Sequence, residues 1–162
     1  DSYLGLKALS NKVKYKNKDK LFFVDKYYKP ELPLNLTKYL LKFANSSIDV
    51  SDGLIDDLAK MINRQSLSFH LFENKIPVSN KLSNYIKKQR FNKINLISNG
   101  DDYQVLFTAD IKKARIIQNA SKATGIKITK IGKIVSGKDR SLILDEKGKQ
   151  IRAKYKGYIH RF

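Results

Sequence analysis

The chain has 162 residues, a formal net charge of +18, 41% hydrophobic residues and no cysteine. This length is enough for one domain with a core, and this apolar fraction argues against a disordered chain. Without cysteine there is no disulfide, zinc thiolate or thiol nucleophile. No apolar run approaches the ~20 residues of a membrane helix and no signal peptide pattern is visible, so we expect a cytoplasmic protein without a membrane partner.

The positive charge comes mostly from lysine and is spread along the chain. Its densest stretch, residues 12–20, has neither helical nor strand periodicity, and we expect a solvated loop there. Lysine, asparagine and isoleucine are abundant together, as A/T-rich coding produces without selecting a partner. A basic nucleic-acid-binding module therefore stays open as an alternative that only the net charge favours.

The first part of the chain is expected to be mainly helical. Residues 2–10 fit a short helix. Residues 29–34 must be extended, because Pro30 and Pro33 fix their own φ and restrict the residues before them. Asn35 can then cap a helix that runs to about residue 44.

The middle of the chain alternates between strands and helices. We expect a short strand at 48–50, a helix at 54–65, a strand at 66–72 and a helix near 81–89. The strand at 66–72 is indicated by strict alternation of apolar and polar residues, and the helices by apolar residues three and four apart. This order predicts helices packed against a sheet.

The last part of the chain contains more short strands. Two apolar runs at 94–98 and 103–108 are joined by a turn, and Asp110 can cap a helix that Gly125 ends after residue 124. Apolar and polar residues alternate over 126–135, with a bend at Gly132. Residues 141–144 and 150–153 are expected to pair as a hairpin. Helices between strands together with late hairpins predict an α+β (mixed α/β) fold, a mixed β-sheet flanked by helices.

Residues 47–58 are the most informative segment, since acidic and hydroxyl side chains crowd a strand-turn-helix junction. Carboxylates at a strand end beside the open N–H groups of a helix N-terminus can hold Mg²⁺ and phosphate together. The alternative is plain capping, in which Ser51 or Asp52 caps the helix and Asp56 and Asp57 interact with its dipole. Capping leaves Asp49 unexplained, because a charge inside a strand is costly without a partner and a shared metal ion would supply one.

The turn at 99–103 can likewise be explained either as a purely structural feature or as a binding site. Asn-Gly between two apolar runs is a strong signal for a plain β-hairpin. The adjacent residues Asp101 and Asp102 could instead hold a cationic ligand or a metal. The aromatic and basic tail at 156–162 either covers apolar surface or offers Tyr158 as a stacking platform for a cationic aromatic ligand.

Together these segments resemble the thiamine-monophosphate kinase family. The resemblance rests on 47–54, 99–108, 131–132 and 157–162, with further landmarks in the right order at 1–6 and 27–30, so it spans nearly the whole chain. The Asp-x-Ser-Asp-Gly-Leu motif at 49–54 is shared with other ATP-dependent enzymes of the aminoimidazole-ribonucleotide synthetase superfamily. The Gly-Asp-Asp-Tyr and Gly-Tyr-x-His segments narrow the resemblance to the kinase.

The resemblance implies a fold and an activity. The family transfers the γ-phosphoryl group of ATP to thiamine monophosphate and forms thiamine diphosphate, with Mg²⁺ as cofactor. This chain, residues 1–162, resembles the single C-terminal domain of such a two-domain kinase. The N-terminal domain, which carries further ATP and Mg²⁺ contacts and forms the homodimer, is absent from this sequence, so this chain by itself is expected to be a poor catalyst.

The resemblance also assigns roles to residues. Asp49 and Asp52 would bind Mg²⁺, Ser51 would contact ATP, and Asp101 and Tyr158 would hold the thiamine moiety. No side chain is expected to act as a nucleophile, because positioning and divalent ions do most of the work in phosphoryl transfer. Another ATP-dependent enzyme of the same superfamily, of the aminoimidazole-ribonucleotide or selenophosphate synthetase type, remains an alternative.

The chain departs from the family pattern at three positions. Asn99 stands where a second Gly is usual, Gln104 replaces a usual Glu, and Arg161 is inserted between His160 and Phe162. The insertion bears on Tyr158, because it could shift the tail around that ring.

Overall fold

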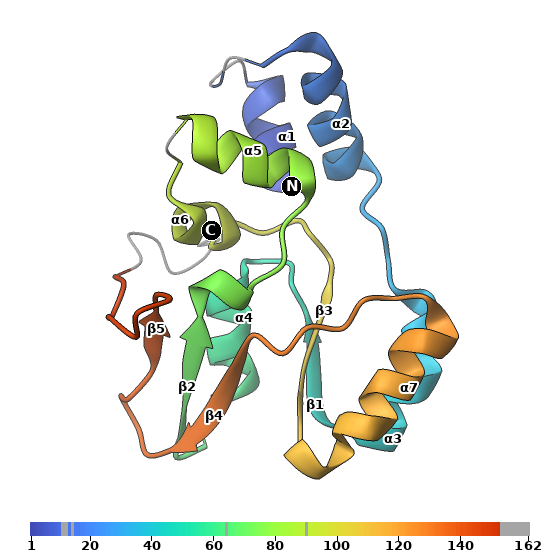
Figure 1. The fold of residues 1–162 in the computed structure, drawn as a ribbon, viewed down its shortest axis with the longest axis vertical. Helices are drawn as coiled ribbons and strands as arrows, with labels where there is room; N and C mark the ends of the chain where they lie inside the picture. The colour runs from blue at the N-terminus through green and yellow to red at the C-terminus, as the bar shows by residue number, and fades with distance from the viewer. Residues whose placement is uncertain (11–12, 14, 64, 90, 153–162) are drawn as a thin grey trace, which may run out of the picture.

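The structure, a computed structural model, describes residues 1–10, 13, 15–63, 65–89 and 91–152 (Figure 1). The helices are α1 (Ser2–Leu9), α2 (Asn17–Tyr28), α3 (Thr37–Phe43), α4 (Leu54–Met61), α5 (Asn80–Gln89), α6 (Lys93–Ile97) and α7 (Ala114–Thr124), with 3-10 turns η1 (Leu34–Leu36), η2 (Glu73–Lys75) and η3 (Ile111–Lys113). The strands are β1 (Ala44–Asp49), β2 (Leu67–Phe72), β3 (Val105–Ala109), β4 (Gly132–Ser136) and β5 (Leu142–Leu144). The predicted α+β class is confirmed.

The strands form two small sheets. In one, β1 pairs antiparallel with β3, with Asp49 opposite Val105 at one end. In the other, the order is β4-β2-β5, where β2 is antiparallel to β4 and parallel to β5. A sheet that contains both senses of pairing agrees with the predicted mixed sheet.

Helix α4 joins the two sheets through the main core. Its apolar residues pack with side chains of β2, β3, β5 and α6, which lie far apart in sequence. The buried members are Val50, Leu54, Ile55, Leu58, Ile62, Phe69, Leu71, Ile76, Ile94, Leu106 and Ile143. Because α4 is held on its apolar face, its N-terminal end has a fixed position relative to the end of β1.

Helices α1, α2 and α5 make a separate layer at one end of the molecule (the top of Figure 1). Its buried residues include Leu4 from α1, Phe23 from α2, and Leu82 and Tyr85 from α5. The Phe23 and Tyr85 rings meet edge to face, with centroids 5.4 Å apart. A third cluster lies at the opposite end, where α3 packs against α7 around Phe43.

Several expected elements have different bounds in the structure. The lysine-rich stretch at 12–20 was expected to be a loop, but α2 already begins at Asn17, because the aromatic face of this helix is buried against α1 and α5. The strand expected at 48–50 begins at Ala44, and the helix expected at 54–65 ends at Met61. Asn35 does not cap α3, whose N-cap residue is Leu36.

The largest correction concerns the apolar run at 94–98. It forms helix α6 rather than a strand, so residues 98–104 connect a helix to β3 and the plain hairpin is wrong. A short apolar run is compatible with a helix or with a strand. Here the side chain of Asn92 caps α6 and so favours the helix. Gly125 ends α7 in the left-handed conformation, as predicted, whereas Asp110 caps η3 and the N-cap residue of α7 is Lys113.

The C-terminal strands are shorter than expected. Residues 126–131 are not in a strand, and β4 begins at Gly132. The hairpin at 141–153 is reduced to β5 and one bridge between Leu144 and Gln150. Within the described part of the chain, no helix is both long and apolar enough to span a membrane.

Candidate active site

Two loops that are distant in sequence meet at the N-terminal end of α4. The backbone N–H of Asp101 donates to the carbonyl of Ser51 at 2.9 Å, and that of Tyr103 donates to Val50 at 2.9 Å. Val50 in turn donates to the carbonyl of Gln104 at 2.9 Å. The two segments singled out in the sequence, 47–54 and 99–108, therefore form one surface.

Glycine is required on both sides of this contact. A Cβ on Gly100 would lie 1.7 Å from the carbonyl oxygen of Ser51, and one on Gly53 would lie 2.4 Å from the carbonyl oxygen of Ser98. Both neighbours are backbone atoms, which cannot rotate away. Gly53 also has a φ of 124°, a region that side-chain-bearing residues rarely adopt.

The buried carboxylate of Asp57 organises the turn before α4. Its Oδ2 accepts the backbone N–H groups of Ser51, Asp52 and Gly53 at 3.0, 3.0 and 3.1 Å. The N-cap residue is Gly53, so the alternative in which Ser51 or Asp52 caps the helix is wrong. Asp57 does more than interact with the helix dipole, because it closes the loop that carries Ser51 and Asp52.

Asp52, Asp56 and Asp57 form an acidic cluster around one lysine. Each offers one carboxylate oxygen, and these oxygens lie within 4.8 Å of one another. The Lys60 ammonium contacts Asp52, lies 2.7 Å from Asp56 Oδ2 and lies 3.3 Å from Asp57 Oδ1. The hydrogen bond with Asp52, followed by that with Asp56, raises the pKa of Lys60 above its ordinary value.

This acidic cluster fits a hard divalent cation. Mg²⁺ prefers carboxylate oxygens, takes one or two from the protein and fills its other positions with water or phosphate oxygens. Asp52 and Asp56 are half-buried at the surface, whereas one oxygen of Asp57 already accepts hydrogen bonds from three backbone N–H groups. We therefore regard Asp52 and Asp56 as the ligands that this local geometry offers, with Asp57 as their support.

Asp49 lies elsewhere and is not part of the acidic cluster. It is the last residue of β1 and is exposed on the polar side of that strand, like Asn45 and Ser47. The argument that Asp49 is a charge inside a strand and so needs a partner is wrong, because water reaches it. Its role as a Mg²⁺ ligand stays a prediction that rests on the resemblance alone.

Asp101 faces the acidic side of the loop contact. Partial burial, then the nearby charges of Asp102 and Asp52, raise the pKa of the Asp101 carboxyl above its usual value. Its backbone has a φ of 70°, which non-glycine residues seldom adopt. A strained, partly desolvated carboxylate beside another carboxylate is suited to a cationic ligand, which would relieve the repulsion.

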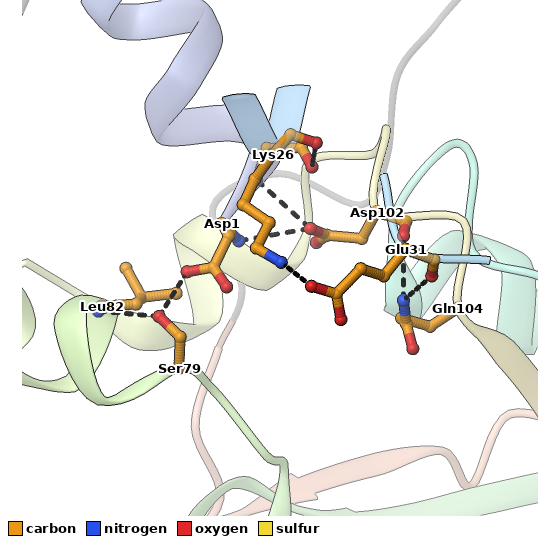
Figure 2. Close-up of polar contacts among 8 residues, drawn as sticks. Asp1, Lys26, Glu31, Ser79, Leu82, Asp102 and Gln104 are labelled. Carbon is orange, nitrogen blue, oxygen red and sulfur yellow. Dashed lines mark hydrogen bonds and ion pairs between the residues drawn. The ribbon is translucent and has the colours of Figure 1, made fainter. Parts of the chain in front are cut away.

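Asp102, the neighbouring residue, points toward Asp1 at the start of α1 (Figure 2). Its Oδ1 accepts from the backbone nitrogens of Asp1 and Ser2, both at 3.2 Å, at the start of α1. Ser79 Oγ donates to the Asp1 carboxylate at 2.7 Å and accepts from the backbone N–H of Leu82 at 3.0 Å. Asp102 thus ties the 99–103 loop to the helical layer.

Gln104 has a contact that explains one departure from the family pattern. Its Nε2 donates to the carbonyl oxygens of Glu31 at 2.9 Å and Asp102 at 3.3 Å (Figure 2). The Glu31 side chain pairs with Lys26 of α2. A glutamate at position 104 has no donor for these carbonyls, so the amide suits this neighbourhood.

The remaining predicted site residues are placed as follows. Ser51 lies in the turn between β1 and α4, with its backbone held by Asp57 and Asp101. Tyr158 lies outside the described residues, as do His160 and Arg161. Sequence reasoning did not predict that Asp56 and Lys60 belong to the site, although their spacing of four residues places them on one helix face.

Comparison with known proteins gives a consistent result. The chain is 32% identical to thiamine-monophosphate kinase of Buchnera aphidicola subsp. Schizaphis graminum over 162 residues, which is 99% of this chain and 49% of that protein. It is 27% identical to the Escherichia coli K12 thiamine-monophosphate kinase, again over 99% of this chain and 49% of that protein. The chain therefore spans about half the length of these curated relatives. No family model matches it.

Comparison with solved structures points to the same family. The fold is similar to AaThiL complexed with AMPPCP and TMP, with a TM-score of 0.73 and 25% identity over 98% of this chain and 48% of that one. It is also similar to the thiamine monophosphate kinase of Aquifex aeolicus, with a TM-score of 0.69 and 25% identity over 94% of this chain and 48% of that one. The neighbours have the aminoimidazole-ribonucleotide synthetase-like fold. The chain is therefore a homologue of the thiamine-monophosphate kinases and corresponds to the C-terminal half of their length.

Proposed function

We propose that this chain is the C-terminal, metal- and substrate-binding half of a thiamine-monophosphate kinase, which transfers the γ-phosphoryl group of ATP to thiamine monophosphate. The observation that carries the proposal is the contact between the two motif loops, in which Asp101 bonds directly to Ser51. Two segments whose residue types suit a phosphate, a cation and a divalent metal are thereby combined in one site. The neighbour that binds AMPPCP, an ATP analogue, and TMP supports the same chemistry.

The roles of the residues follow from their chemistry. Ser51, in the turn that opens α4, contacts ATP, and Asp101 supplies a negative charge for the cationic thiamine moiety. Tyr158 provides an aromatic face for that moiety, since cations bind well to such faces. No nucleophile is needed, because phosphoryl transfer depends mainly on positioning and on charge stabilisation.

Mg²⁺ would be held by Asp52 together with Asp49, as the resemblance implies, or with Asp56, as the local geometry favours. When bound, divalent ions neutralise the phosphate charges that the reaction brings together. The chain's own part is to hold the carboxylates in place: Asp57 closes the loop around Asp52, and Gly53 and Gly100 allow the two loops to approach.

The remaining parts of the proposal concern the complete protein. A second half that carries further ATP and Mg²⁺ contacts would complete the active site, and the complete protein would be a homodimer. The relatives, which are about twice as long as this chain, support the second half. This chain alone is expected to be a poor catalyst, and the cytoplasmic location stays a prediction.

The test is formation of thiamine diphosphate by the complete protein from ATP, Mg²⁺ and thiamine monophosphate. We expect product that depends on all three components. Parallel assays with an aminoimidazole precursor and with selenide cover the sister enzymes of the superfamily. Turnover of either of these without thiamine diphosphate formation would overturn the proposed substrate and leave the fold assignment intact.

A further inference from the structure

The segment 101–104, which carries Asp101, has a strained backbone. Among the described residues, the non-glycine residues with positive φ are Asp101 at 70°, Tyr103 at 49° and Asp139 at 58°. Two of the three therefore lie in this segment, separated by one residue. The left-handed region costs free energy for any residue with a side chain, and aspartate adopts it more readily than tyrosine does. Segment 101–104 therefore needs contacts that hold it in this shape.

The contacts that hold segment 101–104 alternate along the chain. The backbone N–H groups of the two strained residues, Asp101 and Tyr103, donate to carbonyl oxygens of residues 50–51 in the turn before α4, each at 2.9 Å. The side chains of the other two residues, Asp102 and Gln104, bind segments elsewhere in the chain. Each strained residue is therefore followed by a residue whose side chain anchors the segment.

The side-chain anchors reach two further segments (Figure 2). Asp102 Oδ1 accepts from the backbone nitrogens of Asp1 and Ser2, both at 3.2 Å. Gln104 Nε2 donates to the carbonyl oxygens of Glu31 at 2.9 Å and Asp102 at 3.3 Å. Segment 101–104 is thus bound to residues 1–2, 31 and 50–51, which are all distant from it in sequence.

The support that Asp102 binds is itself fixed. Ser2 is only 2% exposed, and its Oγ donates to the carbonyl oxygen of Lys26 in α2 at 3.1 Å. The Asp1 carboxylate accepts from Ser79 Oγ, just before α5, at 2.7 Å. Asp102 therefore attaches the segment to the packed helical layer, whereas the exposed Gln104 attaches it to the extended chain between α2 and α3.

We propose that Asp102 is a positioning residue for the cationic substrate. It touches no ligand, and its hydrogen bonds keep segment 101–104 in the strained shape in which the Asp101 carboxylate faces the thiamine moiety. Without these bonds the segment relaxes, and the apparent affinity falls in proportion to the fraction of molecules that keep the competent shape. Gln104 makes a smaller contribution of the same kind. This inference rests on the proposed function, because it takes Asp101 as the residue that binds the thiamine moiety.

The test measures thiamine monophosphate binding to the complete protein by isothermal titration calorimetry, together with kcat and the KM values of both substrates. Asp102→Ala removes the acceptor, whereas Asp102→Asn removes the charge and keeps one carbonyl oxygen that can accept both N–H groups. The matched control is Asp145→Ala. Asp145 Oδ1 also accepts two backbone N–H groups, those of Lys147 at 2.9 Å and Lys149 at 2.8 Å, in the turn after β5.

We expect Asp102→Ala to bind thiamine monophosphate about tenfold more weakly, which converts to about 1.4 kcal/mol and is on the order of the strain of one left-handed residue. The KM for thiamine monophosphate should rise by the same factor. The KM for ATP and kcat should stay as in the parent protein, because saturating substrate restores the segment. Asp102→Asn and Asp145→Ala should bind as the parent does. Gln104→Met, which loses one exposed donor, should bind about threefold more weakly.

Unchanged affinity in Asp102→Ala would overturn the inference. An equal loss in Asp102→Asn would also overturn it, since the charge of Asp102 would then attract the cation directly. An equal loss in Asp145→Ala would do the same, because it would point to general destabilisation. If Asp102→Ala does not fold, unchanged binding by Gln104→Met overturns the inference. A parent protein that neither binds thiamine monophosphate nor forms thiamine diphosphate overturns the proposed function itself, so the two failures are distinguishable.

Discussion

The two motif loops both use aspartate at the start of a helix, yet they use it in different ways. Around α4, the Asp57 carboxylate accepts hydrogen bonds from three backbone N–H groups, whereas Asp52 and Asp56 lie at the surface and contact Lys60. In the 99–103 loop, Asp102 accepts the backbone N–H of Ser2 at the start of α1, while the charges of Asp102 and Asp52 help to raise the pKa of the partly buried Asp101. Each loop therefore has one carboxylate that accepts backbone N–H groups and so holds the loop in place.

Two adjacent aspartates can have different roles, and the sequence does not show which residue has which role. Residues 56 and 57 are both Asp, as are 101 and 102, and the sequence does not separate them. What separates them is which one meets unpaired backbone donors, because such donors need an acceptor when water is excluded. Carboxylates that satisfy backbone donors should affect stability, and the others should affect activity.

The largest effect is expected for Asp52→Asn in the complete protein. The change keeps the shape of the side chain and removes the charge that holds a divalent ion, so kcat should fall by about a hundredfold or more with little loss of fold. Steady-state kinetics and thermal unfolding measure both. Asp49→Asn tests the resemblance in the same way, and near-normal turnover in both variants would remove the metal-site assignment. Asp145→Asn, in a distant turn, is the control.

Gly100→Ala should separate the loops. Its new Cβ would lie 1.7 Å from the Ser51 carbonyl oxygen, so the backbone must move. We expect a loss of about 3 kcal/mol in unfolding free energy, as for severe overpacking. Urea denaturation gives the value, and Gly148→Ala, with no atom within 4 Å of the new Cβ but a φ of 77°, shows the cost of backbone strain without a steric clash. A loss no greater than that of the control would mean that the loops do not meet this closely.

Asp57→Ala and Asp56→Ala test the division at α4. Asp57→Ala leaves three backbone N–H groups without their acceptor and should cost about 2 to 3 kcal/mol of unfolding free energy. Asp56→Ala removes a partly exposed ion pair with Lys60 and should cost about 0.5 kcal/mol or less. Chemical denaturation of both variants measures the difference. Equal losses would show that Asp57 has no special structural role.

Asp102→Ala should be milder, because it removes the acceptor of two backbone nitrogens rather than of three. We expect a loss of about 1 kcal/mol, typical of a lost helix N-terminal acceptor. Hydrogen exchange of the α1 amides should show the opening of this helix before the rest of the molecule. A uniform increase in exchange across all helices would contradict a local role for Asp102.

Asp101→Asn should raise stability slightly. Burial and two neighbouring charges raise the pKa of Asp101 in the folded state, so its ionised form destabilises the fold at neutral pH. That cost is full above the folded pKa and vanishes as pH falls below the ordinary value. The variant should therefore gain about 0.5 kcal/mol at pH 7 and nothing below about pH 4. Urea titrations at both pH values test this, and a gain that grows on acidification would contradict it.

The α4 loop was predicted better than the helical layer. The spacing of Asp49, Asp52 and Gly53 at a strand-helix junction is local, and local patterns are visible in sequence. Helix α2 was missed because its start at Asn17 lies in a lysine run whose helical state depends on burial of Phe23 by α1 and α5. Helix α6 was missed because a five-residue apolar run fits a strand equally well.

By itself the sequence determined the α+β class, the helix-ending glycine at 125 and the pairing of motifs that resembles one kinase family. Only the tertiary structure decided which carboxylates have which task, since a backbone hydrogen bond joins Asp101 to Ser51, fifty residues away, and the Lys60 side chain contacts Asp52. It also decided that Asp49 is exposed and that Asp102 serves α1. The reason is physical: the role of a charge depends on nearby donors and water, and folding alone brings these together.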